Sequence, residues 1–191
     1  MGLLQVGLGA AESVLSDQWR EYFYCDALTE DVLMKKGEAR QARRAFNTKK
    51  SDNLITNGAI IAVNEGQCMI IVDNGAIVEV SAEPGKFVWD ASTEPSIFYG
   101  GLKRIYFFNT KDIIGNKYGT QNPIPFRIID RNINLDTDVA VRCHGEYAYR
   151  LADPILFYKK LCGNVSDEFR RDRIESQLKT ELLTALQPAF A

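Results

Sequence analysis

The feature that most constrains the fold is a period-two alternation across residues 138–150. One set of alternate positions is mostly apolar and would point to one face of an extended strand: Val139, Val141, Cys143, Gly145, Tyr147 and Tyr149. The opposite face would carry Asp138, Arg142, His144, Glu146 and Arg150. Such alternation is typical of an antiparallel sheet with one face on a core and the other in water. We therefore expect the first set to be inside and the second set outside.

Further strands are expected where β-branched and aromatic residues form short runs bounded by turn residues. These runs are 59–63, 68–72, 77–80, 86–89, 104–108 and 125–130. Asp73-Asn74-Gly75 predicts a tight hairpin, because Asn and Gly tolerate the positive φ angles of a type I′ turn. Residues 115–123 are rich in Gly, Asn and Pro, which predicts a connection rather than a strand.

Two helices are expected near the end of the sequence. Asp153 is suited to the N-cap and Pro154 to the first helical position, so a short helix should run to Leu161 and end at Gly163. A second helix should begin at Ser166, with an apolar stripe at Ile174, Leu178, Leu182 and Leu186. Together these elements predict an α+β domain: a mainly antiparallel, twisted sheet with a short helix and a C-terminal helix.

The first 24 residues have apolar positions at helical spacing, which predicts an amphipathic helix. Its far end is aromatic, at Trp19, Tyr22 and Phe23. Two interpretations stay open. The helix packs on its own domain, or it lies on a membrane with its aromatic rings at the level of the lipid headgroups.

Basic residues dominate the next segment, residues 35–50, where Glu38 is the acidic residue. They are Lys35, Lys36, Arg40, Arg43, Arg44, Lys49 and Lys50. This run predicts a basic loop that is either simply solvated or binds anionic lipid. The expected organisation is residues 1–57 as helix and basic loop, 58–165 as a β-rich domain, and 166–191 as a terminal helix that precedes a tail in the intact protein.

Composition places the chain among ordinary globular proteins, with 191 residues of which 46% are hydrophobic and 25% charged. The 23 basic and 25 acidic residues give a net charge of −2, which argues against a nucleic-acid binder. The longest uncharged stretches fall short of the roughly 20 apolar residues of a membrane-spanning helix. The four cysteines lie far apart and are expected to be free thiols in a reducing compartment.

The sequence offers no obvious catalytic or metal-binding constellation. His144 is the single histidine, and its neighbour Cys143 should point to the opposite face of the same strand. The residues therefore predict no enzyme, no metal site and no cofactor. A hydrolase would require a hidden site around His144.

Four segments of the chain together resemble a known family. They are QCMIIVDNGAIVEVSAEPGKFVWD, YFFNTKD, GTQNPIPFRIID and DTDVAVRCHGEYAYRLADPILFYKKLCG. Over residues 19–191 they are similar to the SPFH (stomatin/prohibitin/flotillin) or Band 7 domain, and more narrowly to its bacterial, virion core protein-like branch. The resemblance includes the early hairpin, the Asn109-Thr110-Lys111 strand end and the Asp153-Pro154 helix start.

The resemblance implies a non-enzymatic scaffold that forms homo-oligomers at the cytoplasmic face of the cell membrane. Membrane proteases, stress-response proteins and anionic lipid are the partners it implies, with no nucleic acid. The residues expected to face lipid are Trp19, Tyr22, Phe23, Lys35, Lys36, Arg40, Arg43 and Arg44. The residues expected at an oligomer interface are Ile174, Leu178, Leu182 and Leu186.

Two points stay open at the level of the sequence. Chains of this branch are expected to carry a longer polar insert near Gly101 and a later tail with a zinc ribbon, and these 191 residues contain neither. The alternative function is a soluble adaptor that binds a protein through the stripe on the last helix.

Overall fold

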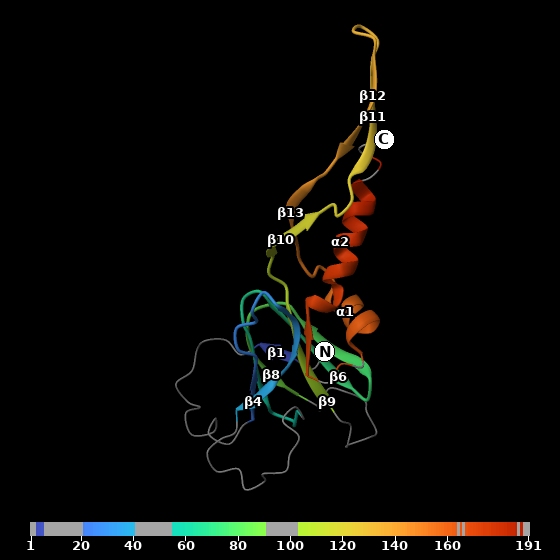
Figure 1. The fold of residues 1–191 in the computed structure, drawn as a ribbon. Helices are drawn as coiled ribbons and strands as arrows, with labels where there is room; N and C mark the ends of the chain where they lie inside the picture. The colour runs from blue at the N-terminus through green and yellow to red at the C-terminus, as the bar shows by residue number, and fades with distance from the viewer. Residues whose placement is uncertain are drawn as a thin grey trace. The chain divides into compact units, whose positions relative to one another are not determined.

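The computed structural model describes residues 3–5, 21–40, 55–90, 103–163, 165, 167–186 and 188. The chain divides into two compact units (Figure 1). The first unit consists of Met1–Lys111 with Leu151–Arg170, and the second of Asp112–Arg150 with Arg171–Ala191. These units do not follow the predicted boundaries at residues 57 and 165.

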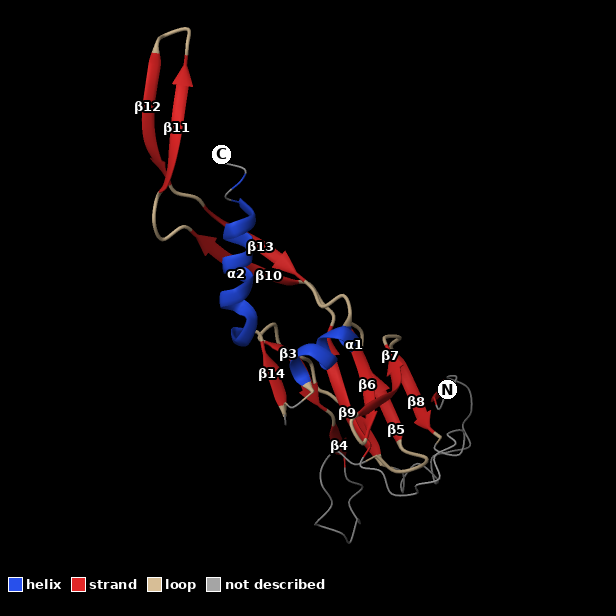
Figure 2. Cartoon of the chain, turned by 90° about the vertical axis from the view of Figure 1, so that its right-hand side faces the viewer, coloured by secondary structure: helices blue, strands red, loops and turns tan. Residues whose placement is uncertain are grey.

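The first unit is built on two five-stranded sheets (Figure 2). One sheet has the order β1 (Leu3–Gln5), β8 (Gly85–Trp89), β5 (Ile60–Val63), β2 (Tyr22–Tyr24) and β4 (Glu38–Arg40). The other has the order β14 (Glu168–Arg170), β3 (Val32–Lys36), β9 (Lys103–Asn109), β6 (Gln67–Asp73) and β7 (Ala76–Ser81). Neighbours are antiparallel except β2 and β5, which are parallel.

The core of this unit lies between the two sheets. Alternate residues of strands from both sheets form one buried cluster, which includes Ile61, Val63, Met69, Ile71, Phe87, Trp89, Ile105 and Phe107. Side chains at i and i+2 share one face of a strand, so β5, β6, β8 and β9 each supply a pair of apolar groups to this cluster. The arrangement is that of two sheets packed face to face.

The second sheet is also covered on its outer face. Short helix α1 (Pro154–Phe157) continues directly into π-helix η3 (Tyr158–Cys162). The Tyr158 ring lies 5.5 Å from that of Tyr106 on β9, and the Phe157 ring lies 5.2 Å from that of Phe169 on β14. Residues 68–72 of β6 are therefore buried on both faces, which explains their continuous apolar run.

Several local predictions are confirmed in this unit. Asn74 and Gly75 have φ angles of 48° and 90°, as a type I′ turn between β6 and β7 requires. Asp153 caps α1 by accepting a hydrogen bond from the Leu156 N–H at 2.8 Å, and Pro154 occupies the first helical position. The α+β fold class is likewise confirmed.

The second unit consists of two antiparallel strand pairs and a helix. Strand β10 (Ile113–Gly119) pairs with β13 (His144–Tyr149), β11 (Ile124–Asp130) pairs with β12 (Leu135–Val141), and the helix is α2 (Asp172–Leu186). The predicted alternation holds: the positions from Val139 to Tyr149 expected inside are half-buried, and the charged positions expected outside are exposed.

The predicted continuous strand is wrong in one respect, because it breaks at Arg142 and Cys143 into β12 and β13. At the break the Cys143 N–H donates to Thr120 Oγ1 at 3.1 Å, and the Thr120 N–H donates to the Cys143 carbonyl at 2.9 Å. These two hydrogen bonds lie where the chain passes from the β11–β12 pair to the β10–β13 pair. Strand β10 was missed, since its glycines and asparagine predicted a connection.

The start of the last helix is also corrected. Residues Glu168–Arg170 form β14, and α2 begins at Asp172 rather than at Ser166, which lies outside the described residues. The reason is tertiary, because Phe169 pairs with Met34 of β3 and packs edge-on against Phe157. Burial of this phenylalanine outweighs the helical preference of the charged residues around it.

The N-terminal helix prediction is wrong where the structure describes the chain. Leu3–Gln5 and Tyr22–Tyr24 are strands, whereas residues 6–20 lie outside the described part. Consecutive aromatic residues suit a strand, and Phe23 completes the core at 1% exposure. The basic loop prediction is wrong at its beginning, because Lys35 and Lys36 belong to β3. Residues 41–54 lie outside the described part.

Candidate interaction surfaces

The predicted lipid-facing residues are only partly available to a membrane. Phe23 is in the core, so its predicted place at the surface is wrong, and Tyr22 is half-buried. Lys35 Nζ lies 2.6 Å from Glu38 Oε1, and this hydrogen bond raises the pKa of Lys35. Lys36 Nζ lies 3.7 Å from Asp167 Oδ1. These two lysines therefore already have carboxylate partners within their own unit.

The remaining predicted lipid contacts cannot be placed on a surface. Arg40 ends β4, and Trp19, Arg43 and Arg44 lie outside the described residues. Lys35 and Lys36 lie on β3 and Arg40 on β4, and these two strands belong to different sheets, so the structure does not unite the predicted set.

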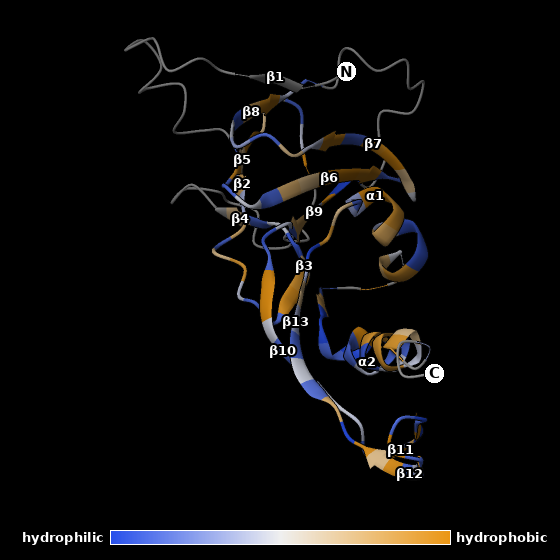
Figure 3. Ribbon diagram, turned by 90° about the horizontal axis from the view of Figure 1, so that it is seen from above, coloured by the Kyte–Doolittle hydropathy of each residue, from blue (hydrophilic) through white to orange (hydrophobic). Residues whose placement is uncertain are grey.

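The predicted oligomer stripe lies on α2 and is half-buried at each of its four positions, Ile174, Leu178, Leu182 and Leu186. No residue of α2 is fully buried. Figure 3 shows apolar and polar residues side by side along this helix. The stripe is therefore covered incompletely by its own unit.

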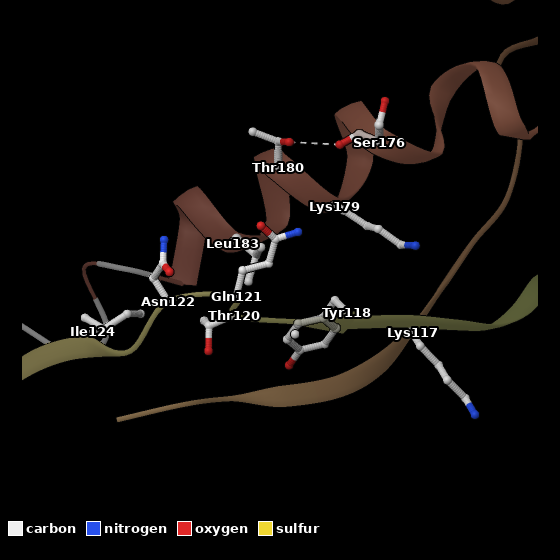
Figure 4. A pocket seen from close by; sticks show the side chains of 11 residues that line it. Lys117, Tyr118, Thr120, Gln121, Asn122, Ile124, Ser176, Lys179, Thr180 and Leu183 are labelled. Atoms are coloured by element: carbon white, nitrogen blue, oxygen red, sulfur yellow. Dashed lines mark hydrogen bonds between the residues drawn. The ribbon is translucent and has the colours of Figure 1, made fainter. Parts of the chain in front are cut away.

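A polar groove of about 640 Å³ runs between β10 and α2 (Figure 4). Hydroxyl and amide side chains line much of it: Thr120, Gln121, Asn122, Ser176 and Thr180. Its two lysines are paired, with Lys179 Nζ 2.6 Å from Glu175 Oε1 and Lys117 Nζ 3.9 Å from Glu146 Oε1. The Lys179 hydrogen bond lowers the pKa of Glu175. Neutral hydrogen-bonding groups beside paired charges suit a polar peptide segment better than an anion.

Two further surfaces are apolar and were not identified from the sequence. The β11–β12 hairpin exposes Ile128, Ile129, Ile133 and Leu135, and the α1–η3 helix exposes Ile155, Leu156 and Leu161. The alternation over residues 138–150 predicted one buried face. The sequence contains no signal that the end of the β11–β12 hairpin is left uncovered.

The structure places the suspected catalytic pair apart. His144 is exposed, whereas Cys143 faces the half-buried side of the chain. Burial raises the pKa of Cys25 and of Cys68 to about 11, so these thiols are protonated and poor nucleophiles at neutral pH. Within the described ranges no three His, Cys, Asp or Glu side chains gather as metal ligands.

Residues 45–190 match the model of the SPFH domain-Band 7 family. The match covers more than half of the chain. The chain belongs to the SPFH domain-Band 7 family. No match is found among curated proteins or among solved structures.

Membership of the SPFH family carries a general function with it. Its members are generally membrane-associated, non-enzymatic scaffolds, and they commonly oligomerise. Among the described residues of this SPFH chain, the helices are too short or too polar to cross a bilayer. Every predicted lipid-facing residue precedes residue 45 and so lies outside the matched range. The virion core protein-like branch stays a prediction.

Proposed function

We propose that this SPFH protein is a non-enzymatic scaffold that self-associates on the cytoplasmic surface of the cell membrane and holds other membrane proteins, such as proteases, in place. The observation that carries the proposal is the family match over residues 45–190. The half-buried stripe on α2 supports self-association, because apolar side chains left partly in water favour a partner.

Lipid contact in this proposal rests on the basic segment after β3. Lys35 and Lys36 are already paired, so the cations left to attract anionic lipid are Arg40, Arg43 and Arg44, with Lys49 and Lys50 after them. Each cation near an anionic surface contributes about 1 kcal/mol. Three arginines are therefore enough to change membrane binding measurably.

Vesicle co-sedimentation tests this step. The chain should bind vesicles that contain phosphatidylglycerol, bind phosphatidylcholine vesicles poorly, and lose binding as salt is raised. The Arg40→Gln, Arg43→Gln, Arg44→Gln variant should reduce binding on the order of tenfold or more. A matched variant changes the exposed cations Lys86, Lys111 and Arg142 to Gln and should bind as the unmodified chain does. Equal binding by both variants would remove the basic segment from the mechanism.

A second function is favoured by the same α2 stripe. The chain would act as a soluble adaptor that binds a protein through Ile174, Leu178, Leu182 and Leu186. Vesicle binding separates the two functions, because an adaptor would bind neither type of vesicle. The double variant Leu182→Glu, Leu186→Glu tests the stripe itself. If the stripe is an interface between copies of the chain, this variant should remain folded and lose self-association in analytical ultracentrifugation. If the stripe is part of the core, the variant should unfold.

A further inference from the structure

The β11–β12 hairpin exposes apolar side chains and pairs with no third strand among the described residues. In the described structure these strands pair only with each other, although two strands alone are marginally stable in water. Ile129 is 59% exposed and Ile133 is 69% exposed. With Ile128 and Leu135 they form an apolar hairpin end that is exposed to water. An exposed apolar patch of this kind indicates a contact with another surface.

The hairpin is protected from pairing with its own copy. Pro125 on the outer edge of β11 has no N–H to donate to a further strand. On β12, antiparallel pairing about Thr137 would set Asp136 opposite Asp138 of a second hairpin, which is a repulsive arrangement. Edge-to-edge association of two hairpins is therefore disfavoured, and the partner surface must be of another kind.

A lipid bilayer is a poor partner for the same hairpin end. Asp130, Arg131 and Asp136 lie among its isoleucines, and insertion would place these charges in the apolar phase. The surface that fits is apolar at its centre and carries cations at its rim.

The chain itself contains such a surface on α1–η3. Leu156 is 52% exposed and Leu161 is 48% exposed, and Ile155 extends the patch. Lys159 and Lys160 of η3 are exposed beside them, and neither has an ion pair among the described residues. Asp138 on the hairpin is likewise exposed with no ion pair in that part of the chain. The two surfaces thus match in apolar character, and Asp138 is opposite in charge to Lys159 and Lys160.

Chain connectivity within the second unit favours a second copy as the donor of this surface. The chain enters and leaves the β10–β13 pair beside the Ile113–Tyr149 pairing, and the hairpin follows from the other end, at Gly119 and His144. The β11–β12 hairpin therefore leaves the β10–β13 pair at the end opposite to these entry points.

We propose that the β11–β12 hairpin of one copy docks on the α1–η3 patch of the next copy, with Asp138 facing Lys159 and Lys160. Because the two surfaces differ, the contact is head to tail and can continue from copy to copy. This inference rests on the self-association in the proposed function and adds a second contact surface to the α2 stripe.

Charge reversal in separate copies tests the docking. The helix variant is Lys159→Glu, Lys160→Glu, and the hairpin variant is Asp138→Lys, which leaves the Arg127–Asp136 ion pair of the hairpin intact. Each alone sets like charges against each other and should weaken association on the order of tenfold or more in analytical ultracentrifugation. An equal mixture should associate again, since each reversed surface then meets one of opposite charge. Lys86→Glu, Lys111→Glu is the matched control and should associate normally.

Three results would overturn the docking: unchanged association of either reversal variant, a mixture that fails to recover, or an unmodified chain that is monomeric both in solution and on vesicles. Circular dichroism confirms that each variant is folded. The uncharged variant Ile129→Ser, Ile133→Ser should lose association in the same way, and normal association of this variant would also refute the docking. Phosphatidylglycerol vesicle binding is measured in parallel, so that failure of the docking is distinguished from failure of the membrane function.

Discussion

The two units both contain antiparallel strands with apolar residues, but they bury these strands to very different extents. In the first unit β6 and β9 are buried on both faces, between a second sheet and a helix. In the second unit Ile113 and Asn116 are the only buried residues among those the structure describes. One unit therefore holds its own core, whereas the other displays its apolar side chains at half exposure. Secondary structure alone does not determine stability, which depends on how many layers cover each strand.

The largest effect should come from truncation in the core between the sheets. Phe107→Ala removes a fully buried ring and should cost about 3–5 kcal/mol of the free energy of unfolding, whereas Phe126→Ala in the half-buried hairpin should cost about 1 kcal/mol or less. Urea unfolding of both variants measures the difference. Equal losses would show that the second unit has a core of its own.

A smaller effect is expected from two buried asparagines, one in each unit. Asn109 Nδ2 donates to the carbonyls of Thr29 and Val32, and Asn109→Ala should cost about 1–3 kcal/mol because both carbonyls lose their donor. Asn116 Nδ2 donates to the carbonyls of Ile113 and Tyr147, which belong to the second unit alone. Amide hydrogen exchange should therefore accelerate only in β10 and β13 for Asn116→Ala. Faster exchange in β6 or β9 would contradict the restriction of this effect to the second unit.

Alkaline pH should weaken the first unit selectively. Burial raises the pKa of Cys25 and Cys68 from 9.0 to about 11, so the folded state retains protons that the unfolded state releases. The contribution of both thiols to stability is complete below pH 9 and is lost as pH rises toward 11. The Cys25→Ala, Cys68→Ala variant should show a smaller decline over this window. An identical decline in both proteins would assign the pH dependence to other groups.

The smallest effect is expected at His144. Its side chain is exposed on β13, so His144→Ala should change stability by less than about 0.5 kcal/mol and leave vesicle binding and association intact. Loss of any one of these properties would indicate a functional site around this residue. Denaturant unfolding and ultracentrifugation suffice as measurements.

What could be predicted from the sequence depended on short-range geometry. The turn at Asn74-Gly75, the cap at Asp153 and the alternation after Asp138 are each determined by residues within a few positions of one another, and each is confirmed. Backbone φ preferences, cap hydrogen bonds and the two-residue period of a strand act locally, so they are visible without the fold.

What the tertiary structure alone decided depended on residues far apart in the chain. Strands β2 and β14 have only three residues each, too few to show a period, and they form because Phe23 lies beside Ile61 and Phe169 beside Met34. The same holds for the candidate surfaces. The sequence specifies that Ile129 and Ile133 are apolar, but whether another element covers them depends on packing between distant segments, which no local pattern encodes.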